Sequence, residues 1–164
     1  MDTLQNNHNF VSLTRLHIRS LRFLPQFMWT NEGIVKQLLS THGFLAGKLS
    51  VAGPREFWTV TVWTDETSMR KYRSAGAHLK AIGRLAEWCD EASVAHWSQD
   101  SEAMPDWETL HQRMQDTGRR SRVNHPSKGH AAEPWTLPLP RRRLERPLKG
   151  ANPGSTTVLP PVTP

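Results

Sequence analysis

His78 is the residue best placed to do chemistry. It follows the small residues Ser74-Ala-Gly-Ala, in a stretch that an acidic helix cap at Asp65 opens. A neutral imidazole can accept a proton from an organic substrate near neutral pH. As a base or a metal ligand, His78 would need a partner carboxylate or a second ligand, and the sequence identifies neither. Two interpretations therefore stay open: a catalytic base, and a histidine that packs against or caps its helix.

Tryptophan side chains could form the walls of an apolar pocket near this histidine. Four of the seven tryptophans, Trp29, Trp58, Trp63 and Trp88, fall within or beside predicted strands and helices. Large aromatic walls suit an apolar organic ligand. Tryptophans at such spacings are also typical of a core or an interface, and this second interpretation stays open.

Two further histidines, His17 and His96, lie on predicted strands and could both face the open side of a sheet. Two histidines do not make a metal site without a third ligand of matching geometry, so no metal site is predicted. Cys89, the only cysteine, lies near the end of a predicted helix and is expected to be structural. The sequence contains no Ser/His/Asp set, phosphate loop or zinc signature, and its residues predict no cofactor.

Strand and helix patterns alternate in an order that defines a fold class. Alternating apolar and β-branched residues predict strands, and apolar residues at helical spacing predict helices. The order strand, helix, strand, strand, helix, strand predicts an α+β, ferredoxin-like βαββαβ domain, with a four-stranded antiparallel sheet and two helices on one face. The predicted strands cover residues 10–19, 44–51, 55–63 and 92–98, and the predicted helices cover 23–40 and about 65–89.

The chain divides into three parts. Residues 1–9 are polar and are expected to be disordered, and residues 10–118 form the α+β domain, which ends with a short helix over 105–117. Residues 119–164 hold nine of the twelve prolines and lack periodicity, so a disordered tail is expected. Within that tail, the segment Ser121–Pro126 could lie against the domain.

The basic character of the sequence belongs to the tail. Residues 119–164 carry a net charge of +7, and the other 118 residues carry −1. The near-neutral domain gives no electrostatic reason to expect specific nucleic-acid binding. The run Arg141-Arg-Arg143 could hold nucleic acid or an acidic membrane weakly, although a solvated tail is favoured.

The sequence favours a cytoplasmic protein. No apolar run approaches the ~20 residues that span a bilayer. The N-terminal residues show no charged-then-apolar signal pattern, and a single cysteine suits a reducing compartment.

The third predicted strand has large apolar residues on both faces. Trp58 and Val60 lie on one face, and Phe57 and Trp63 lie on the other. With helices on one side only, large aromatics would meet water, and such patches usually mark an interface. We therefore expect a homodimer through the sheet face. The alternative is that the tail or the helix over 105–117 covers this face.

Several segments resemble a known superfamily. Phe57-Trp-Thr-Val-Thr-Val-Trp63, Asp65-Glu66 and Ser74-Ala-Gly-Ala-His78 resemble the second βα unit of the dimeric α+β barrel superfamily, which includes antibiotic-biosynthesis monooxygenases and heme-degrading monooxygenases. Over Phe57 to Trp97, the chain is most similar to a group of uncharacterised bacterial proteins of that superfamily. Spheroidene monooxygenase-like proteins are more distantly similar. The resemblance covers about residues 10–98.

The resemblance implies a homodimer joined through its sheets and an apolar organic substrate between sheet and helices. Trp29, Trp63, Tyr72 and His78 would border that substrate, with His96 as a further contact. It also implies monooxygenase activity, in a cofactor-independent form in which the enolate or phenolate of the substrate reacts with oxygen. The protein would supply desolvation and a base, for which His78 is the candidate. A non-enzymatic module that binds a small molecule or a protein is the alternative.

Heme binding is a weaker alternative. Heme-degrading members of the superfamily use a histidine and a tryptophan of the second helix and an asparagine of the first strand. If the helices are registered from Trp63, the histidine position holds Ile82 and the tryptophan position holds Tyr72. The first strand has no asparagine after Asn9, and His78 lies one turn early. The resemblance therefore argues against heme degradation of that type.

Overall fold

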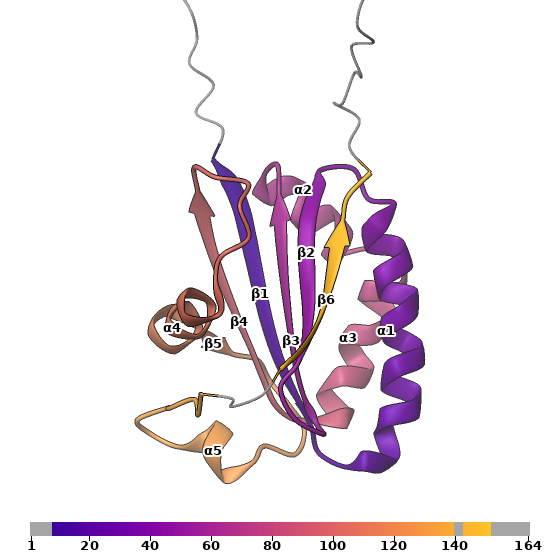
Figure 1. The fold of residues 1–164 in the computed structure, drawn as a ribbon. Coiled ribbons are helices and arrows are strands. Elements are labelled where there is room, and N and C mark those ends of the chain that lie inside the picture. Colours follow the sequence, from indigo (N-terminus) through magenta and orange to yellow (C-terminus); the bar gives the residue numbers. More distant parts are fainter. Residues whose placement is uncertain (1–7, 140–142, 152–164) are drawn as a thin grey trace, which may run out of the picture.

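A six-stranded antiparallel sheet forms the centre of the molecule, with strand order β5-β4-β1-β3-β2-β6 (Figure 1). The computed structural model describes residues 8–139 and 143–151. The strands are β1 (Asn9–Ile18), β2 (Phe44–Val51), β3 (Glu56–Trp63), β4 (Cys89–Gln99), β5 (Arg119–Arg120) and β6 (Leu144–Lys149). The helices are α1 (Leu24–Leu39), α2 (Glu66–Arg73), α3 (Gly76–Trp88), α4 (Trp107–Thr117) and α5 (Lys128–Ala131), with a 3-10 turn, η1 (Leu21–Phe23), before α1.

The predicted α+β ferredoxin-like class is confirmed, but the sheet is wider than the four predicted strands. The two additional strands, β5 and β6, lie at the edges and come from the proline-rich part of the chain. β6 pairs with β2 from Ala46↔Lys149 to Val51↔Leu144, and Leu148 is buried. An edge strand is hydrogen-bonded on one side only, so it tolerates Pro147, which lacks an N–H group and weakened the sequence pattern.

The prediction of a disordered tail was therefore wrong for residues 119–139 and 143–151. Val123, His130 and Leu137 are buried against the domain. The expectation that the segment Ser121–Pro126 lies against the domain is met, because Ser121 and Asn124 donate backbone hydrogen bonds to carbonyl groups of β4 and α3. Most of the predicted disordered N-terminus, the first two arginines of the run at 141–143 and residues 152–164 lie outside the described residues.

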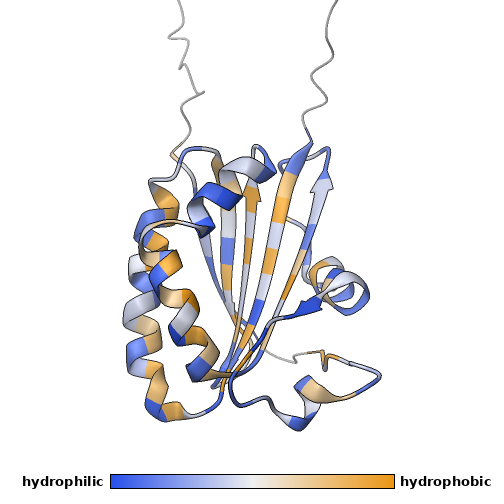
Figure 2. Cartoon of the chain, turned by 180° about the vertical axis from the view of Figure 1, so that it is seen from behind, coloured by the Kyte–Doolittle hydropathy of each residue, from blue (hydrophilic) through white to orange (hydrophobic). Residues whose placement is uncertain are grey.

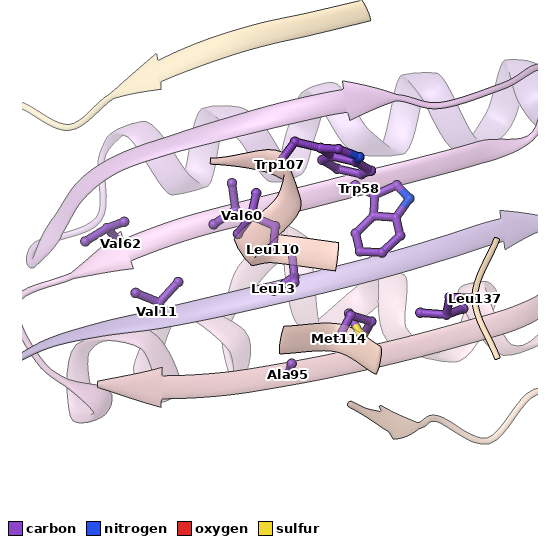
Figure 3. Packing of buried hydrophobic residues seen from close by; sticks show 10 residues of the cluster. All are labelled: Val11, Leu13, Trp58, Val60, Val62, Ala95, Trp107, Leu110, Met114 and Leu137. Atoms are coloured by element: carbon purple, nitrogen blue, oxygen red, sulfur yellow. The ribbon is translucent and has the colours of Figure 1, made fainter. Parts of the chain in front are cut away.

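Helices α1, α2 and α3 cover one face of the sheet, and α4 packs against the other (Figures 1 and 3). On the α4 face, Leu110 and Met114 pack against Val11 and Leu13 of β1 in one buried cluster. Figure 3 shows Trp107 of α4 above Trp58, and their ring centroids are 4.9 Å apart.

The face that we expected to be open is thus covered by α4, the short helix predicted over 105–117. This was the alternative to a homodimer interface in the sequence analysis. Trp58, on this face, is 2% exposed, and Trp63, on the opposite face, is 0% exposed and packs with Tyr72 of α2. The exposed-patch argument for a homodimer was wrong for this face, because α4 occupies the centre of it. Homodimerisation stays a prediction that the resemblance alone supports.

The second predicted helix is two helices. Asp65 caps α2 as predicted, with its carboxylate accepting a hydrogen bond from the Ser68 amide at 2.7 Å. The helix ends at Arg73, and Gly76 adopts φ +56°, a left-handed conformation that suits glycine. The break reorients the chain, so that α3 begins two residues before His78.

Across residues 8–139 and 143–151, we find no helix with the length and apolar character that a membrane crossing requires.

Candidate functional site

A cavity of about 560 Å³ lies between the sheet and helices α1–α3. Figure 2 shows this side of the molecule, with the helices along one border and the hydrophilic strand β5 along the other. Apolar side chains from α1, α3 and β4 form most of its walls. They include Phe27, Ile34, Val35, Leu38, Ile82, Leu85, Ala92 and Val94.

The floor of the cavity is a stripe of hydroxyl groups. Ser12 and Thr14 of β1 lie opposite Thr61 and Thr59 of β3, and all four line the cavity. The Thr61 hydroxyl accepts a hydrogen bond from the Trp63 indole at 2.8 Å. The other three hydroxyls have no hydrogen-bond partner within the described part of the chain. They are therefore available to oxygen or nitrogen atoms of a ligand.

His78 faces this cavity from the first turn of α3. Its Nδ1 lies 3.2 Å from the carbonyl oxygen of Arg73, which can only accept a hydrogen bond. Nδ1 therefore carries the proton of the neutral ring, and Nε2 keeps a lone pair. Burial lowers the pKa of His78, and the hydrogen bond to Arg73 offsets part of that effect. The side chain is thus a neutral base at neutral pH.

Tyr72 lies beside this base, with the two ring centroids 4.9 Å apart. Burial raises the pKa of the Tyr72 phenol, so it stays protonated and can donate a hydrogen bond. Trp63 packs behind Tyr72, with their ring centroids 5.2 Å apart. A base and a donor therefore lie side by side at one end of the cavity.

A second imidazole, His96, faces the same cavity from β4, opposite Ser12 of β1. Its ring centroid is 5.4 Å from that of Phe10. Burial lowers the pKa of His96, and the nearby cations of Arg119 and Arg73 lower it further. Both histidines of the cavity are therefore neutral near pH 7.

Gln37 of α1 holds the corner that positions Tyr72 and His78. Its side-chain amide donates to the carbonyl groups of Tyr72 and Ala75, both at 3.0 Å, and its oxygen accepts from the His78 amide at 2.9 Å. A Cβ atom at Gly76 would lie 3.0 Å from the Gln37 side chain. The small residues before His78 therefore make room for Gln37. Sequence reasoning missed Gln37, since a lone glutamine on an amphipathic helix carries no signal of its own.

The structure brings together three of the five residues predicted for the site. Tyr72, His78 and His96 line the cavity. Trp63 is completely buried and supports Tyr72 from behind, without lining the cavity. Trp29 is 79% exposed on the outer surface of α1, so its predicted role as a pocket wall was wrong.

His17 and His96, the other two histidines that the sequence singled out, do not lie on one face of the sheet. The Nδ1 atom of His17 lies 2.6 Å from a carboxylate oxygen of Asp90, and strand alternation places His17 on the face opposite to His96. The expectation that these two histidines share a face was therefore wrong. Among the described residues, no three or more His, Cys, Asp or Glu side chains gather into a group that could hold a metal ion.

No family model and no curated protein matches the chain. Solved structures match its fold. A protein of unknown function from Nitrosomonas europaea has a TM-score of 0.52 at 11% identity, over 62% of this chain and 98% of that chain. A candidate antibiotic biosynthesis monooxygenase from the same organism has a TM-score of 0.51 at 12% identity, over 60% and 96%. A candidate monooxygenase from Fusobacterium nucleatum has a TM-score of 0.51 at 15% identity, over 72% and 50%.

These matches confirm the predicted resemblance at the level of the fold. The chain has the α+β architecture of antibiotic-biosynthesis monooxygenase-like proteins and of uncharacterised conserved proteins. At such low identities the likeness concerns the fold alone.

Proposed function

We propose that this chain binds an oxygenated aromatic molecule between its sheet and helices α1–α3, and oxidises it as a cofactor-independent monooxygenase. The observation that carries the proposal is the meeting of three features in one cavity of about 560 Å³: apolar walls, a hydroxyl floor and the unpaired Nε2 of His78. A cavity of this size suits an organic molecule of several fused rings.

In the proposed reaction, Nε2 of His78 takes a proton from an acidic CH₂ group of the substrate. The resulting carbanion, stabilised as an enolate or phenolate, transfers electrons to molecular oxygen, and a carbon–oxygen bond forms to give a peroxide. The imidazolium of His78 then protonates the peroxide, which loses water as a carbonyl group forms. One CH₂ group and one O₂ thereby become one C=O group and one H₂O, and His78 returns to its neutral form.

The other polar groups of the cavity stabilise the negative charge that develops on the substrate oxygen. Thr14, Thr59 and Tyr72 line the cavity, and their hydroxyl groups are hydrogen-bond donors. Fixed donors in a site that excludes water stabilise an oxyanion more than water does. The apolar walls supply that exclusion. The likeness in fold to candidate monooxygenases supports the reaction class by analogy.

Oxygen consumption with a panel of anthrones and naphthols, which carry an acidic CH₂ group in their keto forms, tests the proposal. We expect one O₂ consumed for each molecule of ketone or quinone formed. His78→Ala should slow the reaction about 100-fold, the usual contribution of a positioned base. His42→Ala, at an exposed histidine that does not line the cavity, is the matched control and should retain the activity. Oxygen uptake that His78→Ala leaves unchanged would contradict the assigned base.

Two other outcomes would replace this proposal with one of its alternatives. Saturable binding without oxygen uptake, across the whole panel, would indicate a binding module without enzymatic activity. A Soret band on addition of hemin, lost in a His78 or His96 variant, would indicate a heme-binding protein. Val94→Phe fills the cavity from β4. It should abolish binding of the aromatic compounds if the protein is a binding module, and binding of hemin if it is a heme-binding protein.

A further inference from the structure

Arginines from α2, from β5 and from the segment after β5 border the mouth of the cavity. Arg73 ends α2, and Arg119 and Arg122 come from β5 and the segment after it. All three side chains are exposed, and all three line the cavity. None of them forms an ion pair with an acidic side chain among residues 8–139 and 143–151. Positive charge therefore gathers at the opening, with no ion-paired acidic partner in the described part of the chain.

Two neighbouring arginines, by contrast, do form ion pairs with acidic side chains. Arg120 forms an ion pair with Glu133 and donates to the backbone carbonyls of His130 and Ala132 at 2.8 and 3.0 Å. Arg70 forms an ion pair with Glu66 at 2.7 Å. Arg120 thus connects β5 to the segment at α5, and Arg70 pairs within α2. The structure shows no such partner for the side chains of Arg73, Arg119 and Arg122 among the described residues.

The positive charge extends into the cavity. Beyond burial, the charges of Arg119, Arg73 and Arg70 lower the pKa of His96, which lines the cavity beside Ser12, and Glu66 raises it. The arginine cations therefore act on groups inside the cavity as well as on solvent. An arginine guanidinium presents a fork of N–H donors that matches the two oxygens of a carboxylate.

We propose that the natural ligand carries a carboxylate or similar oxyanion, which binds to Arg73, Arg119 and Arg122 while its aromatic part fills the cavity. This inference rests on the proposed function, because it assumes an aromatic ligand in the same cavity. It names the substrate class: aromatic acids rather than neutral aromatics. Only the aromatic end reaches the hydroxyl floor and His78.

Two fluorescent probes with the same ring skeleton separate binding of the oxyanion by the arginines from binding of the aromatic rings in the cavity. The sulfonate 1-anilinonaphthalene-8-sulfonate carries an oxyanion, and N-phenyl-1-naphthylamine is its neutral counterpart. We expect the sulfonate to bind about tenfold more tightly than the amine, and added salt to remove this preference. As a second measurement, 2-naphthoate should displace the sulfonate about tenfold better than methyl 2-naphthoate does, if a carboxylate is accepted as a sulfonate is.

The variant Arg119→Gln/Arg122→Gln tests where the oxyanion binds. It should weaken binding of the sulfonate about tenfold and leave binding of the amine unchanged. Lys80→Gln/Arg84→Gln is the matched control, because it removes the same charge from exposed α3 residues that do not line the cavity. It should change neither affinity. Strand β5 pairs through its backbone, so the substitutions keep that pairing, and thermal unfolding checks this.

The outcomes separate the two proposals. If the wild-type protein binds both probes equally, or if the control variant loses as much affinity for the sulfonate as the mouth variant does, the oxyanion site is overturned and the aromatic cavity stands. If neither probe binds, or if Val94→Phe binds both as the wild type does, the cavity is not the binding site and both proposals fall.

Discussion

The two faces of the central sheet are built from alternate residues of the same strands, yet they differ in character. The face under α4 presents Val11 and Leu13 from β1, and these are completely buried. The opposite face presents Ser12 and Thr14 from the same strand, and these line a cavity. One strand therefore contributes to the core with one set of side chains and to the candidate site with the other.

The two faces also treat their polar groups differently. Arg15, which is 3% exposed, donates to Glu56 at 3.0 Å and to Glu91 at 2.6 Å at the end of the α4 face. On the cavity face, the hydroxyls of Thr14 and Thr59 have no partner among the described residues. On the α4 face, Arg15 is paired, although the buried Ser93 Oγ and Trp107 Nε1 have no hydrogen-bond partner among the described residues. On the cavity face, the unpartnered hydroxyls border open space and are therefore accessible to a ligand.

Truncation of a core side chain of α4 should have the greatest effect on stability. Leu110 is 1% exposed and packs at the centre of that face (Figure 3). Leu110→Ala should lower the free energy of unfolding by about 2–5 kcal/mol, since it removes a buried side chain and leaves a void. Urea denaturation measures this loss. The control Leu79→Ala, at a side chain that is 53% exposed, should cost far less. Equal losses for the two variants would show that α4 is not part of the core.

A pair of swaps at adjacent residues of β3 compares the two faces directly. Val60→Thr places a hydroxyl in the α4 core, where Val60 is 2% exposed, and should cost about 1–3 kcal/mol. Thr59→Val removes a cavity hydroxyl that has no partner in the described chain, and should change stability by about 0.5 kcal/mol or less. Thr59→Val should instead weaken binding of an oxygenated aromatic. A stability loss at Thr59→Val as great as that at Val60→Thr would erase the distinction between the faces.

Removal of the Gln37 side chain should loosen the cavity face without disturbing the α4 face. Gln37→Ala deletes three hydrogen bonds to the corner between α2 and α3, and should cost about 1–2 kcal/mol. Hydrogen exchange of the His78 amide, which donates to Gln37, should become faster. The ranking of the amide exchange rates within β1 and α4 should stay as it is in the wild type. Unchanged protection at His78 would mean that Gln37 does not hold this corner.

Part of the pH dependence of the free energy of unfolding should come from His78 on the cavity face. We expect this effect to be the smallest of the four. Burial holds the pKa of His78 below its ordinary value of 6.5. Just below that pH, the unfolded chain binds more protons than the folded protein, so the free energy of unfolding falls as the pH drops through this window. His78→Asn should flatten this part of the curve in urea denaturation at a series of pH values. A curve with the same slope in the variant would contradict the lowered pKa.

Much of this organisation could be predicted from local patterns. Strand alternation in β3 and the cap at Asp65 depend on residues close in sequence, and both are confirmed. The prediction for Trp29 failed because a large aromatic residue on an amphipathic helix can lie on either side of it. Gln37 and His78 are far apart in sequence, so only the folded chain shows that they meet.

The proline-rich region misled sequence reasoning for a different reason. β6 pairs with β2 through backbone groups, which leave no apolar pattern to recognise. The arginines at the cavity mouth could be seen in the sequence only as part of a basic tail. Their separation into paired Arg120 and unpaired Arg119 and Arg122 depends on the position of Glu133 in space.

The most direct test of the cavity as a binding site with a neutral base is nitrogen NMR of the histidine rings, recorded with and without 1-naphthol. We expect His78 to carry its proton on Nδ1, and we expect the ligand to shift the signals of His78 and His96 while those of the exposed His42 stay in place. An Nε2–H tautomer at His78, or a titration that shifts neither His78 nor His96, would contradict the proposed site.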